Sequence, residues 1–293
     1  CLHKKYRLLK TQQYYMSREV VLPSTIKEIG DGAFFCSKIS SINLPEGLEK
    51  IGDAAFYACR LKEVWIPNSC QTIAGTNTFQ QNYPLKKIHL PEGLGRIPSC
   101  FANDCWDLQE VNIPSTVKSI DRAAFEQCKS LKKINLPDGL ETIEREAFYH
   151  CDSLEQIIFP ATLNFLGQEC CSYMPGLKRI YCMSSEPPIC KESTLNPGNS
   201  PFGKYNSDFY LRTPNDIPIY IPIGAAEKYR NAWGWDYFTN FIETDDFPTA
   251  IHNVTTEHYD SKNCVYDLIG RKVINPQKGQ VYIKNGKKIL FAY

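Results

Sequence analysis

An excess of charge of one sign is absent from this chain of 293 residues. Its 33 lysines and arginines are balanced by 32 aspartates and glutamates, which gives a net charge of +1. That balance argues against a general binder of nucleic acids or other polyanions, because such proteins present a strongly basic surface. A run of eighteen apolar residues is also lacking, so the sequence predicts no membrane-spanning helix.

The usual sequence signatures of catalysis and metal binding are missing as well. The chain has only five histidines and contains no HExxH, no GxSxG, no Walker loop and no EF-hand series. No two cysteines form a CxxC, and no cysteine–histidine cluster has the spacing of a zinc site. We therefore expect a protein without enzymatic activity, catalytic residues, cofactor or metal.

An internal repeat is the dominant feature of what is present. Seven segments align on a proline, with separations of 22, 22, 24, 23, 23 and 23 residues. Such periods are typical of leucine-rich repeats. The anchoring prolines are Pro23, Pro45, Pro67, Pro91, Pro114, Pro137 and Pro160.

Each repeat explains its own local structure. The stretch Leu61–Pro67 alternates apolar and variable residues over the length of a strand, and the proline ends the strand because it cannot donate to a sheet. A second apolar pair follows, such as Leu48 and Ile51, and then an Ala-Phe pair that should form a short helical or irregular return on the convex side. Since one unit cannot bury its apolar face alone, neighbouring units must stack into a solenoid.

The thirteen cysteines fall largely within the repeat pattern. Cys59, Cys128 and Cys151 follow the repeat phenylalanine by three residues, whereas Cys36 comes one residue early. Three further assignments place Cys70 in the position of Val117, Cys100 in that of Ala124, and Cys170-Cys171 in that of an Ala-Phe pair. These positions favour buried free thiols that act as small hydrophobic groups. Disulfides at Cys36–Cys59 or Cys128–Cys151 are the alternative, because adjacent strands lie ~4.8 Å apart.

The repeat pattern LPxxLxxIgxxAFxxCxxLxxI resembles the BspA-like (Treponema-type) leucine-rich repeat, which is common in surface and secreted proteins of Bacteroidales. The resemblance covers residues 20 to about 243. It implies an α/β repeat fold, a leucine-rich-repeat solenoid with a parallel β-sheet on its concave face. It also implies an interaction or adhesion protein at the cell envelope (the outer-membrane surface) or secreted from the cell.

The pattern also suggests how the chain is divided. Residues 1–19 are expected to form an N-terminal cap, and residues 20–243 the solenoid, with a turn-rich insertion at about 183–217. A final strand over 218–222 and a short helix over 224–232 should then lead into an aromatic C-terminal cap, which a solenoid needs for solubility. That cap is expected to contain Trp233, Trp235, Tyr237, Phe238 and Phe241.

Residues 244–293 are expected to form a small all-β module. Val281–Lys284 and Lys287–Leu290 flank Asn285-Gly286, a strong hairpin signal, and a second pair of short strands is expected over 265–268 and 271–273. This tail is similar to the C-terminal β tails of Bacteroidales surface proteins, some of which are secretion signals, so a sorting, an anchoring and a purely terminal role all stay open. At the other end, Cys1 is either a lipidated N-terminus left by a lipoprotein signal peptidase or the edge of a fragment.

Outward positions of the strands are the candidate binding residues. In each strand the two residues flanking the inward Val or Ile should point away from the core, and eight such rows at ~4.8 Å make a face roughly 35 Å long. Exposed aromatics among amides and charges suit contact with a host or bacterial-surface protein, and a glycan captured for nutrient uptake is the alternative partner. The expected ligand-binding residues are Asn43, Glu63, Trp65, Lys87, His89, Glu110, Asn112, Lys133, Asn135, Ile158, Arg179, Tyr181 and Tyr220.

Overall fold

The computed structural model describes residues 18–191, 199–204 and 213–248, together with the backbone of three short strands between residues 265 and 290. By their contacts the residues separate into two compact units, 1–250 and 251–293. The larger unit contains the repeats. The expected N-terminal cap over residues 1–19 lies outside the described residues except for its last two.

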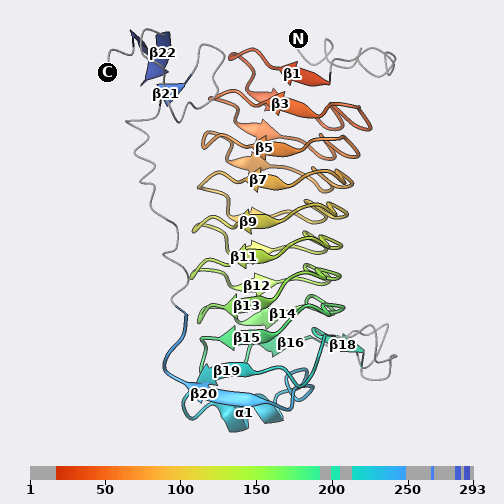
Figure 1. Cartoon of the computed structure of the whole chain (residues 1–293), viewed down its shortest axis with the longest axis vertical. Helices are drawn as coiled ribbons and strands as arrows, with labels where there is room; N and C mark the ends of the chain where they lie inside the picture. Colours follow the sequence, from red (N-terminus) through yellow and green to blue (C-terminus); the bar gives the residue numbers. More distant parts are fainter. Residues whose placement is uncertain are drawn as a thin grey trace. The chain divides into compact units, whose positions relative to one another are not determined.

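The first unit is a stack of turns, and each turn contributes a short strand to one side of the solenoid, here called the front face (Figure 1). The strands are parallel and in register, so that Glu63, Val64 and Trp65 lie beside Lys87, Ile88 and His89. The central residue of these strands is inward and the flanking residues are outward, as the alternation predicts. The front strands are β1 (Glu19–Val21), β3 (Ser41–Asn43), β5 (Glu63–Trp65), β7 (Lys87–His89), β9 (Glu110–Asn112), β11 (Lys133–Asn135), β13 (Gln156–Phe159), β15 (Arg179–Cys182), β19 (Ile219–Pro222) and β20 (Phe241–Thr244).

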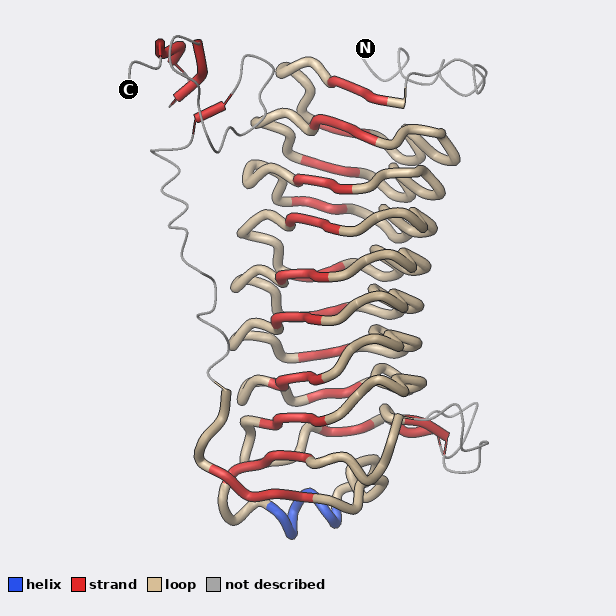
Figure 2. The backbone as a smooth tube through the Cα atoms, viewed as in Figure 1, coloured by secondary structure: helices blue, strands red, loops and turns tan. Residues whose placement is uncertain are grey.

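A second row of two-residue strands lies on the rear side and forms two parallel sheets, one of three strands and one of five (Figure 2). These strands arise from the second apolar pair of each repeat, whose isoleucine or leucine is usually buried, as Ile51 and Ile97 are. The rear strands are β2 (Glu28–Ile29), β4 (Lys50–Ile51), β6 (Thr72–Ile73), β8 (Arg96–Ile97), β10 (Ser119–Ile120), β12 (Thr142–Ile143), β14 (Phe165–Leu166) and β16 (Ile189–Cys190). The predicted leucine-rich-repeat solenoid is therefore confirmed, with two strands in each turn where the sequence indicated one.

The segments between a rear strand and the next front strand, here called the turn edge, contain turns and no helix among the described residues. The sequence predicts a helical or an irregular return segment after the Ala-Phe pair. The described return segments are irregular, and none of them is helical. Two positions in each described return adopt a left-handed backbone, and all of them except Gly32 in the first return are residues other than glycine; Ala123 and Gln127 have φ of 55° and 58°. Their N–H groups donate to the carbonyls of Arg145 and Tyr149 in the next turn, which holds the returns together.

A ladder of buried phenylalanines runs through the core behind the turn edge. Phe34, Phe56 and Phe79 stack with centroid separations of 5.3 and 5.2 Å and nearly parallel planes. Phe125 and Phe148 stack in the same way at 5.8 Å. Parallel stacking follows because equivalent side chains of identical turns must share one rotamer and one direction.

The ladder is interrupted where the Ala-Phe order is reversed to Phe101-Ala102. The N–H of Ala102 donates to Ala124, as the N–H of Phe125 donates to Ala147, so that Ala102 occupies the phenylalanine position. Phe101 fills the alanine position and meets Phe79 and Phe125 edge-on, at 79° and 77°. The assignment of Cys100 to the position of Ala124 was therefore wrong by one residue, because matching the letters Ala-Phe hid the reversal. Cys100 corresponds to Ala123 and is only half-buried.

Thr78 lies in the alanine position of its turn, fully buried, and its hydroxyl has no hydrogen-bond partner among the described residues. Replacing it with valine keeps the shape and removes the uncompensated hydroxyl. We expect Thr78→Val to raise the free energy of unfolding by about 1 kcal/mol, measured by chemical denaturation. Thr78→Ser is the matched control, because it keeps the hydroxyl and loses the methyl group. A loss of stability in the valine variant would show that the hydroxyl has a partner.

The repeat cysteines also form a ladder. The thiols of Cys105, Cys128 and Cys151 lie 3.2–3.3 Å from the carbonyl oxygens of Phe79, Ala102 and Phe125, each in the preceding turn. All eleven described cysteines are free, and burial raises the pKa of Cys128 and Cys151 well above the usual value. The favoured reading, buried free thiols, fits these positions, and neither alternative disulfide is present.

Cys36 is an exception to that reading. It is exposed, has φ of 54° and corresponds to Ala58, so its assignment to the core was wrong. Ser37 occupies the cysteine position of this turn instead, with its Oγ 3.2 Å from the Sγ of Cys59.

The last turns incorporate part of the expected insertion. Pro201 accepts a hydrogen bond from the N–H of Cys171, as Cys170 accepts one from Phe148, and Phe202 beside it is buried. The segment also contains β17 (Asn199–Ser200) and β18 (Gly203–Lys204), which pair antiparallel. Residues 192–198 and 205–212 of the insertion lie outside the described residues.

The C-terminal end of the solenoid is closed by α1 (Ala226–Asn231), which Figure 1 shows beyond β20, and by a group of buried aromatic side chains. Trp235 is fully buried, donates from Nε1 to the carbonyl of Pro188 at 2.9 Å, and packs against Tyr229 and Phe202. Tyr237 and Phe238 are buried too, whereas Trp233 is half-buried. These aromatics belong to the core.

The second unit contains an antiparallel sheet with the order β21 (Val265–Tyr266), β22 (Val281–Lys284), β23 (Lys287–Leu290). Val281 pairs with Leu290 and Lys284 with Lys287, the register that a hairpin closing at Asn285-Gly286 requires. The strand expected over 271–273 lies outside the described residues.

Candidate binding surface

The outward side chains of the front strands form two columns that run along the solenoid. The first column takes the first residue of each strand: Glu19, Ser41, Glu63, Lys87, Glu110, Lys133, Gln156 and Arg179. The second takes the third residue, or the second residue of β19 and β20: Val21, Asn43, Trp65, His89, Asn112, Asn135, Ile158, Tyr181, Tyr220 and Ile242. All thirteen residues expected to bind a ligand lie in these columns, and all are exposed or half-exposed.

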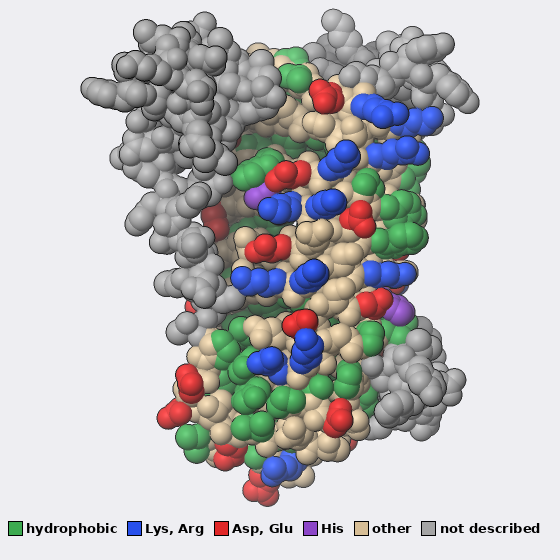
Figure 3. Space-filling view, viewed as in Figure 1, with side chains coloured by type: hydrophobic (Ala, Val, Ile, Leu, Met, Phe, Trp, Pro, Cys, Tyr) green, Lys and Arg blue, Asp and Glu red, His purple; other side chains and the backbone are tan. Residues whose placement is uncertain are grey.

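Charge alternates in the first column over four successive strands. Glu63 lies beside Lys87, Lys87 beside Glu110, and Glu110 beside Lys133. Figure 3 shows acidic and basic side chains following one another down the middle of this face. Adjacent unlike charges limit the repulsion that a single-sign column at ~4.8 Å spacing would produce.

These charges are hardly used inside the protein. Of the ten contacts that the described residues form between a Lys, Arg or His side chain and a carboxylate, only His89–Glu63 joins two members of the front columns. Elsewhere neighbouring turns are linked by pairs such as Lys27–Glu49 and Arg122–Glu146. Lys87, Glu110 and Lys133 therefore remain available to charges on a partner.

Trp65 and His89 form the aromatic pair of the second column. Their rings stack with a centroid separation of 3.3 Å and an interplanar angle of 9°, and Trp65 is still 51% exposed. The Nε2 of His89 lies 3.0 Å from Oε1 of Glu63. Burial, above all, lowers the pKa of His89 below its usual value, although the Glu63 carboxylate acts in the opposite direction. At neutral pH this contact is therefore a hydrogen bond from a neutral imidazole, not an ion pair.

The rest of the second column divides into an amide pair and an apolar strip. Asn135 donates from Nδ2 to Oδ1 of Asn112 at 2.7 Å, which bridges β9 and β11. Farther along, Tyr181 and Tyr220 stack at 4.6 Å and 14°, between Ile158 and Ile242. Cross-strand stacking of this kind stabilises a sheet and also leaves an apolar surface in solvent.

A shallow depression of about 290 Å³ lies between β7 and β9. Its lining includes Lys87, His89, Glu110 and Asn112 from the front columns, together with Leu90 and Pro114. It joins the aromatic pair to the amide pair. A partner side chain could enter here and meet charged, amide and imidazole groups together.

Another exposed surface, on the turn edge, was not predicted from the sequence. Tyr83 and Trp106 pack at 4.5 Å, and Nζ of Lys129 lies 5.1 Å from the centre of the Trp106 ring. Phe35 and Tyr57 stack nearby at 4.8 Å. The sequence does show aromatic residues directly after the repeat phenylalanine or after the cysteine position. The direction of these side chains depends on the left-handed turns, and an alternating or helical sequence period does not predict such turns.

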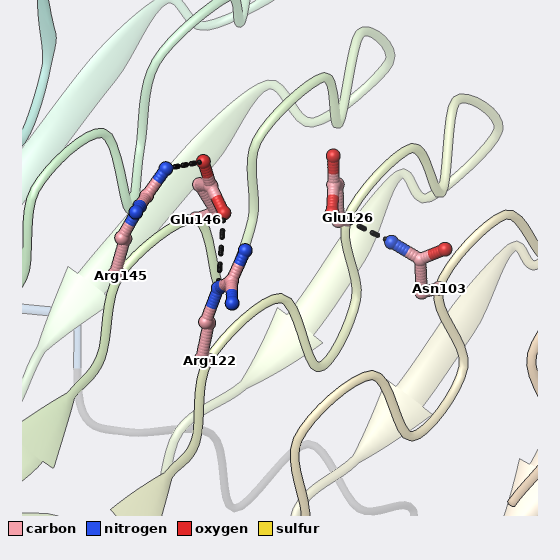
Figure 4. A network of polar contacts seen from close by, with 5 residues as sticks. All are labelled: Asn103, Arg122, Glu126, Arg145 and Glu146. Carbon is pink, nitrogen blue, oxygen red and sulfur yellow. Dashed lines mark hydrogen bonds and ion pairs between the residues drawn. The ribbon is translucent and has the colours of Figure 1, made fainter. Parts of the chain in front are cut away.

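Polar contacts continue along the turn edge (Figure 4). Asn103 donates to Glu126 at 2.6 Å, and Glu146 accepts from Arg145 at 2.6 Å and from Arg122 at 3.3 Å. Burial raises the pKa of Glu126, and the nearby Glu146 and Asp104 raise it further. The Asn103–Glu126 and Arg122–Glu146 contacts link neighbouring turns, whereas the buried Nε of Arg145 has no hydrogen-bond partner among the described residues.

Nothing in the described residues points to catalysis by metal or to a membrane crossing. No three His, Cys, Asp or Glu side chains there are grouped so as to hold a metal ion. In the same residues, no helix has the length and apolar character that crossing a bilayer would require.

The fold and the surface define a leucine-rich-repeat solenoid of the bacterial kind. Residues 12–103 and 97–193 match the model of the BspA type leucine rich repeat region, in six copies. This match covers more than half of the sequence, so the chain belongs to that family. Comparison with curated proteins gives no significant match.

Among solved structures, the chain is similar to a leucine-rich repeat protein from Eubacterium ventriosum, with 25% identity and a TM-score of 0.50 over 53% of this chain and 42% of the other. It thus spans less than half the length of that relative. A leucine-rich repeat protein from Bacteroides ovatus gives 21% identity and a TM-score of 0.44 over 79% and 73% of the two chains. A leucine rich cell surface protein from Faecalibacterium prausnitzii gives 19% and 0.40 over 79% and 61%.

Proposed function

We propose that this protein is a non-enzymatic interaction module, displayed on the cell surface or secreted, that binds a partner protein across the front face of its solenoid. The observation that carries the proposal is the column Glu63, Lys87, Glu110, Lys133, in which the last three residues form no ion pair with any other residue that the structure describes. Surface location is supported by family membership and by the relative described as a cell surface protein. A lipid anchor at Cys1 and a sorting role for the tail stay predictions.

The exposed aromatics of the front face fit a protein partner better than a glycan. Trp65 is stacked on His89, and Tyr181 on Tyr220, so each ring has one face already covered. One face of each ring is therefore lost to a sugar, whereas Trp and Tyr are enriched at protein interfaces, where polar and charged groups such as those beside these rings form the rim. Glycan capture is the second candidate, supported by the amide-lined depression beside His89.

The test is a binding screen followed by alanine substitution. The purified chain is screened against extracellular and cell-envelope proteins and against a glycan array, and the affinity for each hit is measured for Trp65→Ala, His89→Ala and Tyr181→Ala. We expect at least one substitution to weaken binding by about tenfold or more, because buried aromatic residues dominate interfaces.

Trp106→Ala is the matched control, since Trp106 has a similar exposure of 43% but lies on the turn edge. It should leave the affinity unchanged. Unchanged affinity in all three front-face variants would remove that face from consideration, and a glycan hit that the same variants abolish would favour the second candidate.

A further inference from the structure

We infer that the partner segment recognised by the front face is an α-helix lying along the solenoid, whose facing side chains carry alternating charges, one on each helical turn. This inference rests on the proposed function and names the kind of partner. It is argued from the spacing of the front strands, from the order of their charges and from the second column beside them.

Spacing is the first argument. The four charged residues Glu63, Lys87, Glu110 and Lys133 stand on consecutive strands, ~4.8 Å apart. A helix rises 5.4 Å for each turn, so over three steps its side chains drift from the strands by only about 2 Å, which long side chains can absorb. An extended segment presents the same side about every 6.8 Å and is out of step by more than one strand over the same length.

Charge order is the second argument. The column reads acidic, basic, acidic, basic, so a helix that presents basic, acidic, basic, acidic groups meets an opposite charge at every step. Within the described part of the chain, Lys87, Glu110 and Lys133 form no ion pair that a partner charge would have to break. A helix shifted by one turn would meet a like charge at each of the shared steps, so the column sets register as well as attraction.

The second column supplies the contacts beside the charges. Trp65 offers an exposed ring at the first of the four strands, and the Asn112–Asn135 amide pair lies at the last two. Between them, the depression lined by Lys87, His89, Glu110 and Asn112 can take one side chain. The fitting helix is therefore amphipathic, with an apolar residue next to its first charge and polar residues next to its last two.

The experiment uses two synthetic helical peptides of the same composition and the full chain. One peptide carries Lys, Glu, Lys, Glu at positions i, i+4, i+7 and i+11, which lie on one face of a helix at about one residue per turn; the other carries Lys, Lys, Glu, Glu at those positions. Affinities are measured by isothermal titration calorimetry at low ionic strength, where exposed charge pairs act most strongly. We expect the alternating peptide to bind about tenfold more tightly, because two attractive pairs become repulsive in the other peptide.

A charge exchange on the protein provides the decisive control. The double variant Lys87→Glu, Glu110→Lys gives a column of two acidic residues followed by two basic ones, with no change in net charge. Both positions are exposed, and the thermal midpoint should stay within a few degrees. The preference should then reverse in favour of the Lys, Lys, Glu, Glu peptide.

Equal affinity of both peptides for both proteins, or no binding of either peptide, would overturn the inference. The proposed function would still stand if the screened partner protein lost affinity with the front-face alanine variants. Conversely, if the affinity of the screened partner protein were unchanged by those variants, the proposal that the front face binds it would be wrong, independently of the peptide affinities.

Discussion

Replacing Phe125 with alanine is expected to lower the free energy of unfolding by about 3–5 kcal/mol. The ring is fully buried and stands between Phe101 and Phe148, with centroids 6.2 and 5.8 Å away. Its loss removes buried apolar area and leaves a cavity in the middle of the solenoid, where the turns on both sides are held by backbone hydrogen bonds and cannot close the gap. Urea denaturation followed by circular dichroism measures the effect.

Phe35→Ala is the matched control for that substitution. Phe35 is stacked on Tyr57 at the turn edge but is 48% exposed, so its removal creates no cavity. It should cost about 1 kcal/mol or less. If Phe125→Ala were as mild as Phe35→Ala, the phenylalanine ladder would not be the main source of cohesion between turns.

Asn82→Ala is expected to cost about 3 kcal/mol, a large loss for one polar side chain. Asn82 is fully buried in the position that holds cysteine in neighbouring turns. Its Nδ2 donates to the carbonyls of Phe56 and Phe79 at 2.8 and 2.9 Å, and its Oδ1 accepts from the N–H of Leu61 at 3.2 Å. Alanine would leave a buried N–H without a partner and weaken the pairing of both carbonyls.

The reason for asparagine at this position lies in the preceding turn. In longer turns the leucine three residues after the cysteine donates to the cysteine carbonyl, as Leu131 donates to Cys128. Leu61 follows Cys59 by only two residues, and its N–H donates to Asn82 instead. Asn82→Cys should therefore be intermediate in stability, since a thiol can donate to Phe56 but cannot serve Leu61. A cysteine variant as stable as the original would contradict this account.

Much of the front face could be predicted because a strand has a side-chain period of two. Once the prolines are aligned, Val64 and Ile88 must face inward, and Trp65 and His89 must face outward together. The sequence could not show that Lys87 and Glu110 form no ion pair among the described residues, or that burial lowers the pKa of His89, because both depend on side-chain positions.

The turn edge was harder to predict. The left-handed backbone positions of the turn edge recur only with the full length of a repeat and have no shorter period. The residues there could therefore be assigned only by matching residue types between repeats. Matching failed at Phe101-Ala102, where the pair is reversed, and at Cys36, which occupies an exposed position. The rear strands were missed for a related reason: two residues are too few for a period to be visible.

The central claim, that the front face is the binding surface, is tested most directly by hydroxyl-radical footprinting of the full chain with and without a partner protein found in the screen. The account predicts that oxidation of Trp65, Tyr181 and Tyr220 falls in the complex, while oxidation of Tyr83 and Trp106 on the turn edge is unchanged. Protection of Tyr83 and Trp106 with Trp65 and Tyr181 still fully reactive would contradict it.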